Sequence, residues 1–323
     1  MSTPSQAKLA SGVSVRPMRE ADLTAAREIC RVAFGTFLGA PNPSTFWPDR
    51  DYIVTRWRTD PTSAFAAEVQ GALAGSNFAT NWGSFGFFGP LTIRPELWNK
   101  GVAQSLLGPT MDLMFQKWGT REAGLFTFAQ STGHIHLYQK FGFWPRFLTA
   151  IMSRPIESGA RATISKYSAA NPTDREAALK ACRSLTNAIF EGLDVSREIQ
   201  GIEEQKIGET VLLWGGDTLE GFAVCHCGAG TEAGAEACYV KFAAAKPGPN
   251  AGRTFERLLD ACAALGAERG LKRLDAGVNL ARSLAYRDML RHGFRTQFQG
   301  VAMQRPDSPA YNRADVYVVD DWR

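Results

Sequence analysis

The chain has 323 residues, of which 45% are hydrophobic and 21% charged, and its 36 basic and 32 acidic residues leave a net charge of +4. This length suits two domains of ordinary size, the composition is that of a globular protein, and the charge is too small to indicate nucleic-acid binding. The N-terminus lacks the apolar core of a signal peptide and no stretch approaches the roughly 20 apolar residues of a membrane span, so we expect a cytoplasmic protein without a membrane partner.

The first quarter of the chain predicts a strand, a helix and a hairpin. Residues 1–12 are expected to form a disordered leader, and residues 13–17 a short strand. Asp22 is a candidate N-cap for a helix whose apolar positions share one face: Leu23, Ala26, Ile29, Cys30 and Ala33. Residues 64–69 and 72–80 then predict two strands that meet at the turn Gln70-Gly71.

The most informative stretch is GPLTIRPELWNKGVAQSLL, residues 89–107. It predicts a strand end at 91–93, a Pro-containing turn, a loop of small residues at 99–103, and an amphipathic helix that continues through Met111 and Phe115. Such a helix start presents unpaired N–H groups and partial positive charge, which suit the phosphates of a nucleotide-like ligand. Taken alone, a loop of this kind is more often only a turn.

A second motif, STGHIHLYQKFGF, follows at residues 131–143. With both motifs the chain resembles the GNAT superfamily of acyl-CoA-dependent N-acetyltransferases. Ile93, Pro95, Gly101 and Ala103 fit that family's cofactor signature, an aliphatic residue, a spacer, Pro, then Gln/Arg-x-x-Gly-x-Gly/Ala, whereas Trp98 stands in the Gln/Arg position. The family's helix motif, Asn-x-x-Ala-x-x-Leu-Tyr-x-Lys-x-Gly-Phe, is matched by Leu137, Tyr138, Lys140, Gly142 and Phe143, with Ser131 replacing Asn and His134 replacing Ala.

The resemblance implies acetyl-CoA as cosubstrate and no metal. The cofactor contacts it implies are Leu91, Thr92, Ile93, Trp98, Asn99, Lys100, Gly101, Val102, Ala103, Gln104 and Ser131. Tyr138 is the expected acid for the departing thiolate, because a phenol can donate a proton at neutral pH. The base is open: Glu68, Glu96 and His134 are candidates on reach alone, and water could serve instead.

The second half of the chain repeats the order of elements of the first. Residues 147–155 predict the strand that closes an N-terminal domain at 13–157, and residues 158–163 a linker to a C-terminal domain at 164–323. That domain predicts a helix with Thr173 or Asp174 as N-cap, strands at 210–214, 219–227 and 236–245, a helix, a strand at 273–278, and a helix ending at 291–294.

The motifs of this second domain are weaker. Gly252 aligns with Gly101, but Met289 stands where Tyr138 stands, and a thioether cannot donate a proton. Tyr286 lies one helical turn earlier. We therefore expect a degenerate domain with a structural or regulatory role, and whether it binds CoA stays open.

Two other patterns carry less weight. KPGPNAGRT at 246–254 lacks the glycine spacing and the lysine of a phosphate-binding P-loop. Cys225-His226-Cys227, with Cys238, has metal-ligand residue types, but in a strand His226 points away from both cysteines, so we expect buried reduced thiols and no metal.

The predicted fold is therefore α+β, with two tandem GNAT-like domains, each a mixed, largely antiparallel sheet flanked by helices. The predicted function is transfer of an acetyl group from acetyl-CoA to a primary amine by direct attack; the alternatives are a non-catalytic acyl-CoA-binding or regulatory module and a scaffold that binds neither ligand. The acceptor, a small amine, an aminoglycoside-like antibiotic, an amino acid or a peptide N-terminus, stays open, although the aromatic residues within 37–57 favour one with an apolar part. The choice between monomer and homodimer also stays open.

Overall fold

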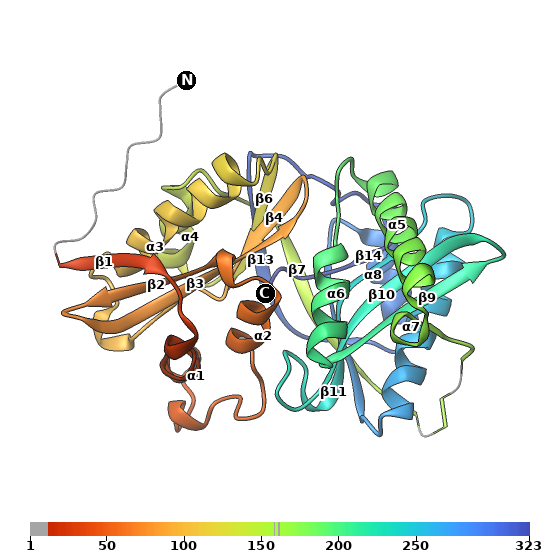
Figure 1. Cartoon of the computed structure of the whole chain (residues 1–323), viewed down its shortest axis with the longest axis horizontal. Coiled ribbons are helices and arrows are strands. Elements are labelled where there is room, and N and C mark those ends of the chain that lie inside the picture. Colours follow the sequence, from red (N-terminus) through yellow and green to blue (C-terminus); the bar gives the residue numbers. More distant parts are fainter. Residues whose placement is uncertain (1–11, 158, 161) are drawn as a thin grey trace.

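A computed structural model of the protein describes residues 12–157, 159–160 and 162–323. The leader predicted at 1–12 lies outside the described residues apart from Gly12, as do two positions of the linker predicted at 158–163. We call residues 12–157 the N-terminal half and residues 162–323 the C-terminal half. The two halves lie side by side, the first in red to yellow and the second in green to blue in Figure 1.

The N-terminal half contains the following strands and α-helices: β1 (Val13–Pro17), α1 (Leu23–Phe37), α2 (Ile53–Thr59), β2 (Ala64–Val69), β3 (Ala72–Trp82), β4 (Phe85–Phe88), β5 (Thr92–Ile93), α3 (Val102–Met111), β6 (Glu122–Thr127), α4 (Thr132–Gln139) and β7 (Trp144–Pro155). In the C-terminal half they are β8 (Ser165–Lys166), α5 (Pro172–Ile189), α6 (Ser196–Gln205), β9 (Gly208–Gly215), β10 (Thr218–Gly228), β11 (Gly234–Ala245), α7 (Ala251–Glu268), β12 (Arg273–Asn279), α8 (Ser283–Arg291), β13 (Arg295–Arg305) and β14 (Val318–Val319).

The strands of the described residues join into one mixed sheet in the order β1-β2-β3-β4-β6-β13-β7-β12-β11-β10-β9-β8, with β5 paired to β3 and β14 to β11. Most pairs are antiparallel, and β4 with β6 and β11 with β12 are parallel. Helices pack against this sheet in both halves (Figure 1). The predicted α+β class with a mixed sheet is confirmed, whereas the domain boundaries stay a prediction.

Local sequence signals predicted the elements well and the helix caps poorly. The hairpin between β2 and β3 turns at Gln70 and Gly71, both with positive φ, as a two-residue turn requires. Asp22 does not cap α1: its carboxylate instead accepts the Arg19 N–H at 2.8 Å and binds Arg16. Asn171, rather than Thr173 or Asp174, caps α5, because Pro172 fits the first helical position.

The two halves exchange their last long strands. β7 pairs with β12 and β13, and β13 pairs with β6 and β7, so β6 is completed by a strand of the other half. The expectation that residues 147–155 close the N-terminal sheet is therefore wrong. Ala150, Ile151 and Met152 are all buried, and a strand with two apolar faces fits the middle of any sheet, so its own sequence does not choose its neighbour.

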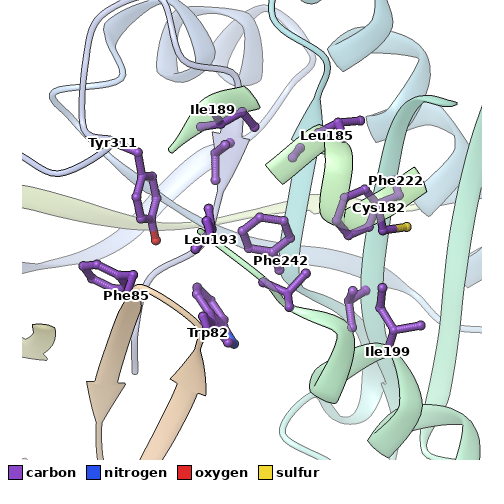
Figure 2. Close-up of a cluster of buried hydrophobic side chains, with 14 of the residues drawn as sticks. Trp82, Phe85, Cys182, Leu185, Ile189, Leu193, Ile199, Phe222, Phe242 and Tyr311 are labelled. Atoms are coloured by element: carbon purple, nitrogen blue, oxygen red, sulfur yellow. The ribbon is translucent and has the colours of Figure 1, made fainter. Parts of the chain in front are cut away.

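A shared core joins the halves behind this exchange. Figure 2 shows Trp82 and Phe85 of the N-terminal half near Phe242 and Tyr311 of the C-terminal half; the ring centroids of Trp82 and Phe242 are 5.2 Å apart, and those of Phe85 and Tyr311 also 5.2 Å. A buried ion pair adds to this contact, with Arg56 Nε donating to Glu232 Oε1 at 2.8 Å. The halves thus share both a sheet and a core.

The segment after β13 runs back through the molecule as a buried tail, residues 309–323. Arg282, with a fully buried side chain, anchors it by donating to Asn312 Oδ1, the Val318 carbonyl and Asp320 Oδ1 at 2.8–3.0 Å. Trp322 then packs on Gly124 of β6, where an added Cβ would lie 2.7 Å from the indole ring. The tail therefore links the interior of the C-terminal half to the N-terminal half.

Candidate active site

A cavity of about 1080 Å³ lies where the N-terminal sheet opens. β4 pairs with β6 over Phe85–Phe87 only, and beyond that point the chain turns away at Gly89 so that β5 pairs with β3 alone. The cavity fills the resulting N-terminal gap, with Phe88–Ile93 on one wall and Leu125–Phe128 on the other. The edge of β5 that faces away from β3 is thus unpaired.

Backbone N–H groups point into this gap. Arg94 N–H donates to Ala74 O at 2.9 Å, so by the alternation of an antiparallel pair the N–H groups of Leu91 and Ile93 point away from β3. The loop that follows bends with positive φ at Asn99 and Gly101, and α3 begins at Val102. Its first-turn N–H groups, at Val102, Ala103 and Gln104, have no partner within the helix.

The predicted cofactor residues lie in this region, and most of them line the cavity: Leu91, Thr92, Ile93, Trp98, Asn99, Gly101, Ala103, Gln104 and Ser131. Val102 and Lys100 do not. Val102 is buried against Leu106 and Ile93 and contributes its backbone, whereas Lys100 is exposed.

Trp98, the departure from the family signature, holds the loop in place. Its indole Nε1 donates to the Ile93 carbonyl at 2.8 Å, and its ring packs beside Val102 and Leu106. The bond ties the loop to the free edge of β5, so the loop keeps a defined position although the Gln/Arg side chain is missing.

Tyr138 and His134 lie one turn apart on α4 and both line the cavity. Tyr138 is 8% exposed and packs edge-on against Phe88, and burial raises the pKa of its phenol. His134 stacks on Phe37 with centroids 5.0 Å apart, and burial lowers the pKa of its imidazole. At neutral pH the pair therefore combines a protonated phenol with a neutral imidazole.

The two carboxylates named as possible bases are not on the cavity wall. Glu68 accepts hydrogen bonds from Arg16, at 2.8 Å from Nε and 2.6 Å from Nη2. Glu96 is 67% exposed and 3.9 Å from Arg94. His134 is therefore the one of the three that the fold brings beside Tyr138.

Part of the cavity wall comes from residues that the sequence did not single out. The C-terminal half contributes Arg273, Asp275, Gln297, Phe298, Trp322 and Arg323, and the segment 34–52 adds Phe34, Phe37, Trp47, Arg50 and Tyr52. The one sequence signal that pointed to this wall was the high content of aromatic residues within 37–57. Arg273 and Asp275 lie in an ordinary strand, and strand exchange brings them to the site.

The corresponding C-terminal gap, between β11 and β12, is filled by the chain itself. β11 pairs with β12 over Ala237–Val240, and beyond this stretch β14 of the tail pairs with β11 at Ala243 and Ala244. Tyr317 lies over the start of α7, where its hydroxyl would be 2.9 Å from a Cβ added to Gly252. Met289, in the position that corresponds to Tyr138, is fully buried.

The cysteines of the C-terminal half that lie near one another, Cys225, Cys227, Cys238 and Cys262, are free thiols, and all but Cys227 are buried. Cys225 packs in the core on one face of β10, with its Sγ 3.8 Å from that of Cys262. His226 points to the other face, and burial lowers its pKa to about 3. Among the described residues no group of three or more His, Cys, Asp or Glu side chains is arranged to hold a metal. Nor does any described helix have the length and apolarity to cross a membrane.

Comparisons with known proteins agree with this geometry. The model of the Acetyltransferase (GNAT) family matches residues 29–143, which include both motifs and the loop between β5 and α3. No curated relative matches the sequence.

Solved structures extend the likeness over the whole chain. A protein of Pyrococcus horikoshii, named only as a candidate acetyltransferase, is 12% identical with a TM-score of 0.68, covering 97% of this chain and 95% of its own. A GCN5-related N-acetyltransferase from Sphaerobacter thermophilus is 14% identical with a TM-score of 0.59, covering 92% and 96%. One from Anabaena variabilis is 11% identical with a TM-score of 0.53, covering 93% and 74%.

At such low identity the solved structures show the fold alone, and it is the fold of GNAT proteins of similar length. The sequence match adds that residues 29–143 resemble the GNAT acetyltransferase family, so the family likeness in sequence covers most of the N-terminal half and the likeness in fold covers nearly the whole chain.

Proposed function

We propose that the protein is an N-acetyltransferase that transfers the acetyl group of acetyl-CoA to a primary amine in the cavity of the N-terminal half. One observation carries the proposal: a single cavity brings together the free edge of β5, the start of α3 and Tyr138. Each of these three features supplies a different part of acyl transfer.

The residues present fit acetyl-CoA. The first turn of α3 offers N–H groups and the positive end of the helix dipole to a pyrophosphate, and Gly101 and Ala103 leave room for it. Lys140 adds a cation to the wall. The volume of about 1080 Å³ is at the upper end for small-molecule sites.

The chain's own groups provide the catalysis. Acetyl-CoA, when bound, would supply a thioester carbonyl that an amine can attack directly. The Leu91 and Ile93 N–H groups can stabilise negative charge on the carbonyl oxygen, and the Tyr138 hydroxyl can donate the proton that a leaving thiolate needs. His134, neutral at pH 7, can accept the proton that the amine loses.

Calorimetric titration of acetyl-CoA into wild type and Gly101→Trp tests the site. We expect about one site per chain in wild type, and at least about 100-fold weaker binding in the variant, because an indole would block the loop. Gly119→Trp is the matched control: Gly119 also has positive φ, at +67°, but lies in an exposed turn away from the cavity. Unchanged binding in Gly101→Trp would place the cosubstrate elsewhere.

Turnover separates this function from the alternative. Release of CoA in the presence of an amine panel supports the transferase. Tight binding of acetyl-CoA without any turnover over that panel would instead support a non-catalytic acyl-CoA-binding module, which the replacement at Trp98 would then explain.

A further inference from the structure

One end of the cavity wall is polar and is built from both halves. There Asp275 accepts from the Ser153 hydroxyl at 2.7 Å, and its other oxygen lies 3.2 Å from Arg273 Nε and 3.8 Å from Arg50 Nη2. Ser153 lies on β7, opposite Asp275 of β12, and Arg50 precedes α2. We call Arg50, Ser153, Arg273 and Asp275 the polar end.

Aromatic side chains line the cavity beside both Tyr138 and this polar end. His134 and Tyr138 have ring centroids 6.5 Å apart, and His134 stacks on Phe37. Phe34, one turn earlier on α1, packs on Trp47 at 5.2 Å, and the Arg50 guanidinium lies 5.6 Å from the centroid of the Trp47 ring. An acceptor with its amine beside Tyr138 that reaches the polar end would therefore lie against aromatic side chains.

The charges of the cavity wall favour an anion at that end. Among the described residues that line the cavity, Asp275 is the one acidic residue, and Arg50, Lys140, Arg273 and Arg323 are basic. Arg323 is paired with Asp321 at 2.9 Å. Asp275 is therefore the shared carboxylate partner of both Arg50 and Arg273. Glu236 also lies 3.9 Å from Arg273, but it is half-exposed and pairs with Lys272.

Two guanidinium groups that share one carboxylate can accept a second carboxylate with little rearrangement, because each presents several N–H donors in a fixed fork. Asp275 has a hydroxyl donor and a guanidinium already, so an ammonium group would have to displace them. A polycation such as an aminoglycoside therefore finds no free acidic group on this wall.

We propose that the acceptor is an amine with an aromatic or aliphatic body and a carboxylate at its far end, and that Arg50 and Arg273 bind this carboxylate. The inference rests on the proposed function, because it takes the amine to lie beside Tyr138. Arg50 and Arg273 are specificity residues in this account and take no part in the proton transfers.

Three probes of equal shape test the proposal: 4-(aminomethyl)benzoate, 4-(aminomethyl)benzamide and 1,4-bis(aminomethyl)benzene, with glycine as a short amino acid. Binding of each is measured by calorimetry with CoA present, and acetylation is measured separately. We expect wild type to bind the benzoate at least about tenfold more tightly than the amide, and the diamine and glycine least tightly. The preference should appear in KM rather than in kcat.

Arg50→Gln and Arg273→Gln should each reduce the benzoate preference to below about threefold. Arg257→Gln, which removes a half-exposed arginine paired with Glu220 outside the cavity, should leave it unchanged. Equal binding of the three aromatic probes by wild type, preference for the diamine, no binding of any probe, or an unchanged preference in both cavity variants would overturn the proposal.

The two readouts keep this proposal apart from the proposed function. Selective binding of the benzoate without acetylation would support the anion site and count against the transferase. Acetylation of all probes at similar KM would support the transferase and count against the anion site.

Discussion

The two gaps in the sheet have the same origin and different contents. In each half a parallel strand pair, β4 with β6 or β11 with β12, separates after a few residues. The N-terminal gap opens into a cavity of about 1080 Å³, whereas the C-terminal gap holds β14 and the start of α7 is covered by Tyr317. The unpaired backbone N–H and C=O groups of a strand edge need hydrogen-bond partners. A ligand can supply these partners, or the chain's own tail can pair with the edge.

The two halves also differ in what they contribute to the cavity. The tail that fills the C-terminal gap ends with Trp322 and Arg323 on the wall of the N-terminal cavity, and strand exchange brings Arg273 and Asp275 to that same wall. The C-terminal half thus contributes residues to the wall of its neighbour's cavity, while its own gap is filled by the tail. The following predictions test that division.

The largest effect is expected from loss of the tail's anchor. Arg282→Met would leave Asp320 buried at 1% exposure without its ion-pair partner, which should lower the free energy of unfolding by about 3–5 kcal/mol. Urea unfolding measures this change. Adding Asp320→Asn should recover part of it, and the surface variant Arg257→Gln should stay within about 0.5 kcal/mol of wild type. A loss below about 1 kcal/mol for Arg282→Met would show that the tail is held in some other way.

The next largest effect is expected from removal of a single tyrosine hydroxyl, which should slow acetyl transfer in the N-terminal half but not in the C-terminal half. Tyr138→Phe keeps the packing against Phe88 and removes the proton donor, so single-turnover acetyl transfer should slow by about 10²–10⁴-fold while acetyl-CoA binding stays unchanged. Tyr286→Phe, on the corresponding helix α8, should leave the rate unchanged. A rate within about threefold of wild type for Tyr138→Phe would reject it as the acid.

A smaller effect is expected from the titration of His134. Burial lowers its pKa in the folded state, so below about pH 6.5 the unfolded chain binds a proton that the folded chain does not. The contribution of His134 to the free energy of unfolding is therefore fully present above pH 6.5. It falls as the pH drops from 6.5 to the lower pKa of the folded state. An NMR titration, with His134→Gln to assign the resonance, should place its pKa below 6.5. A value at or above 6.5 would remove the reason to regard it as a neutral base at pH 7.

Local signals explain how much the sequence could predict. The strand, the loop with Gly101 and the helix start are set by residues close together in the chain, and so is the helix with Tyr138. In the structure all of them line one cavity. The assigned contacts and roles of these residues stay predictions.

The remainder of the site depends on pairings between distant segments. Nothing in the alternation of β12 distinguishes Arg273 and Asp275 from other polar strand residues until β7, a strand of the other half, lies beside them. The two valines of β14 are too short a signal for a strand, and only their pairing with Ala243 and Ala244 reveals it.

The strand exchange also has a consequence during synthesis. β6 leaves the ribosome long before β13, since Arg305 lies 178 positions after Thr127. At about 5–20 residues per second, the inner edge of β6 waits roughly 10–35 s for its partner. During that time an apolar strand edge is open to pairing with other chains, so a nascent chain stalled before β13 should be a substrate for chaperones and proteases rather than an active half-enzyme.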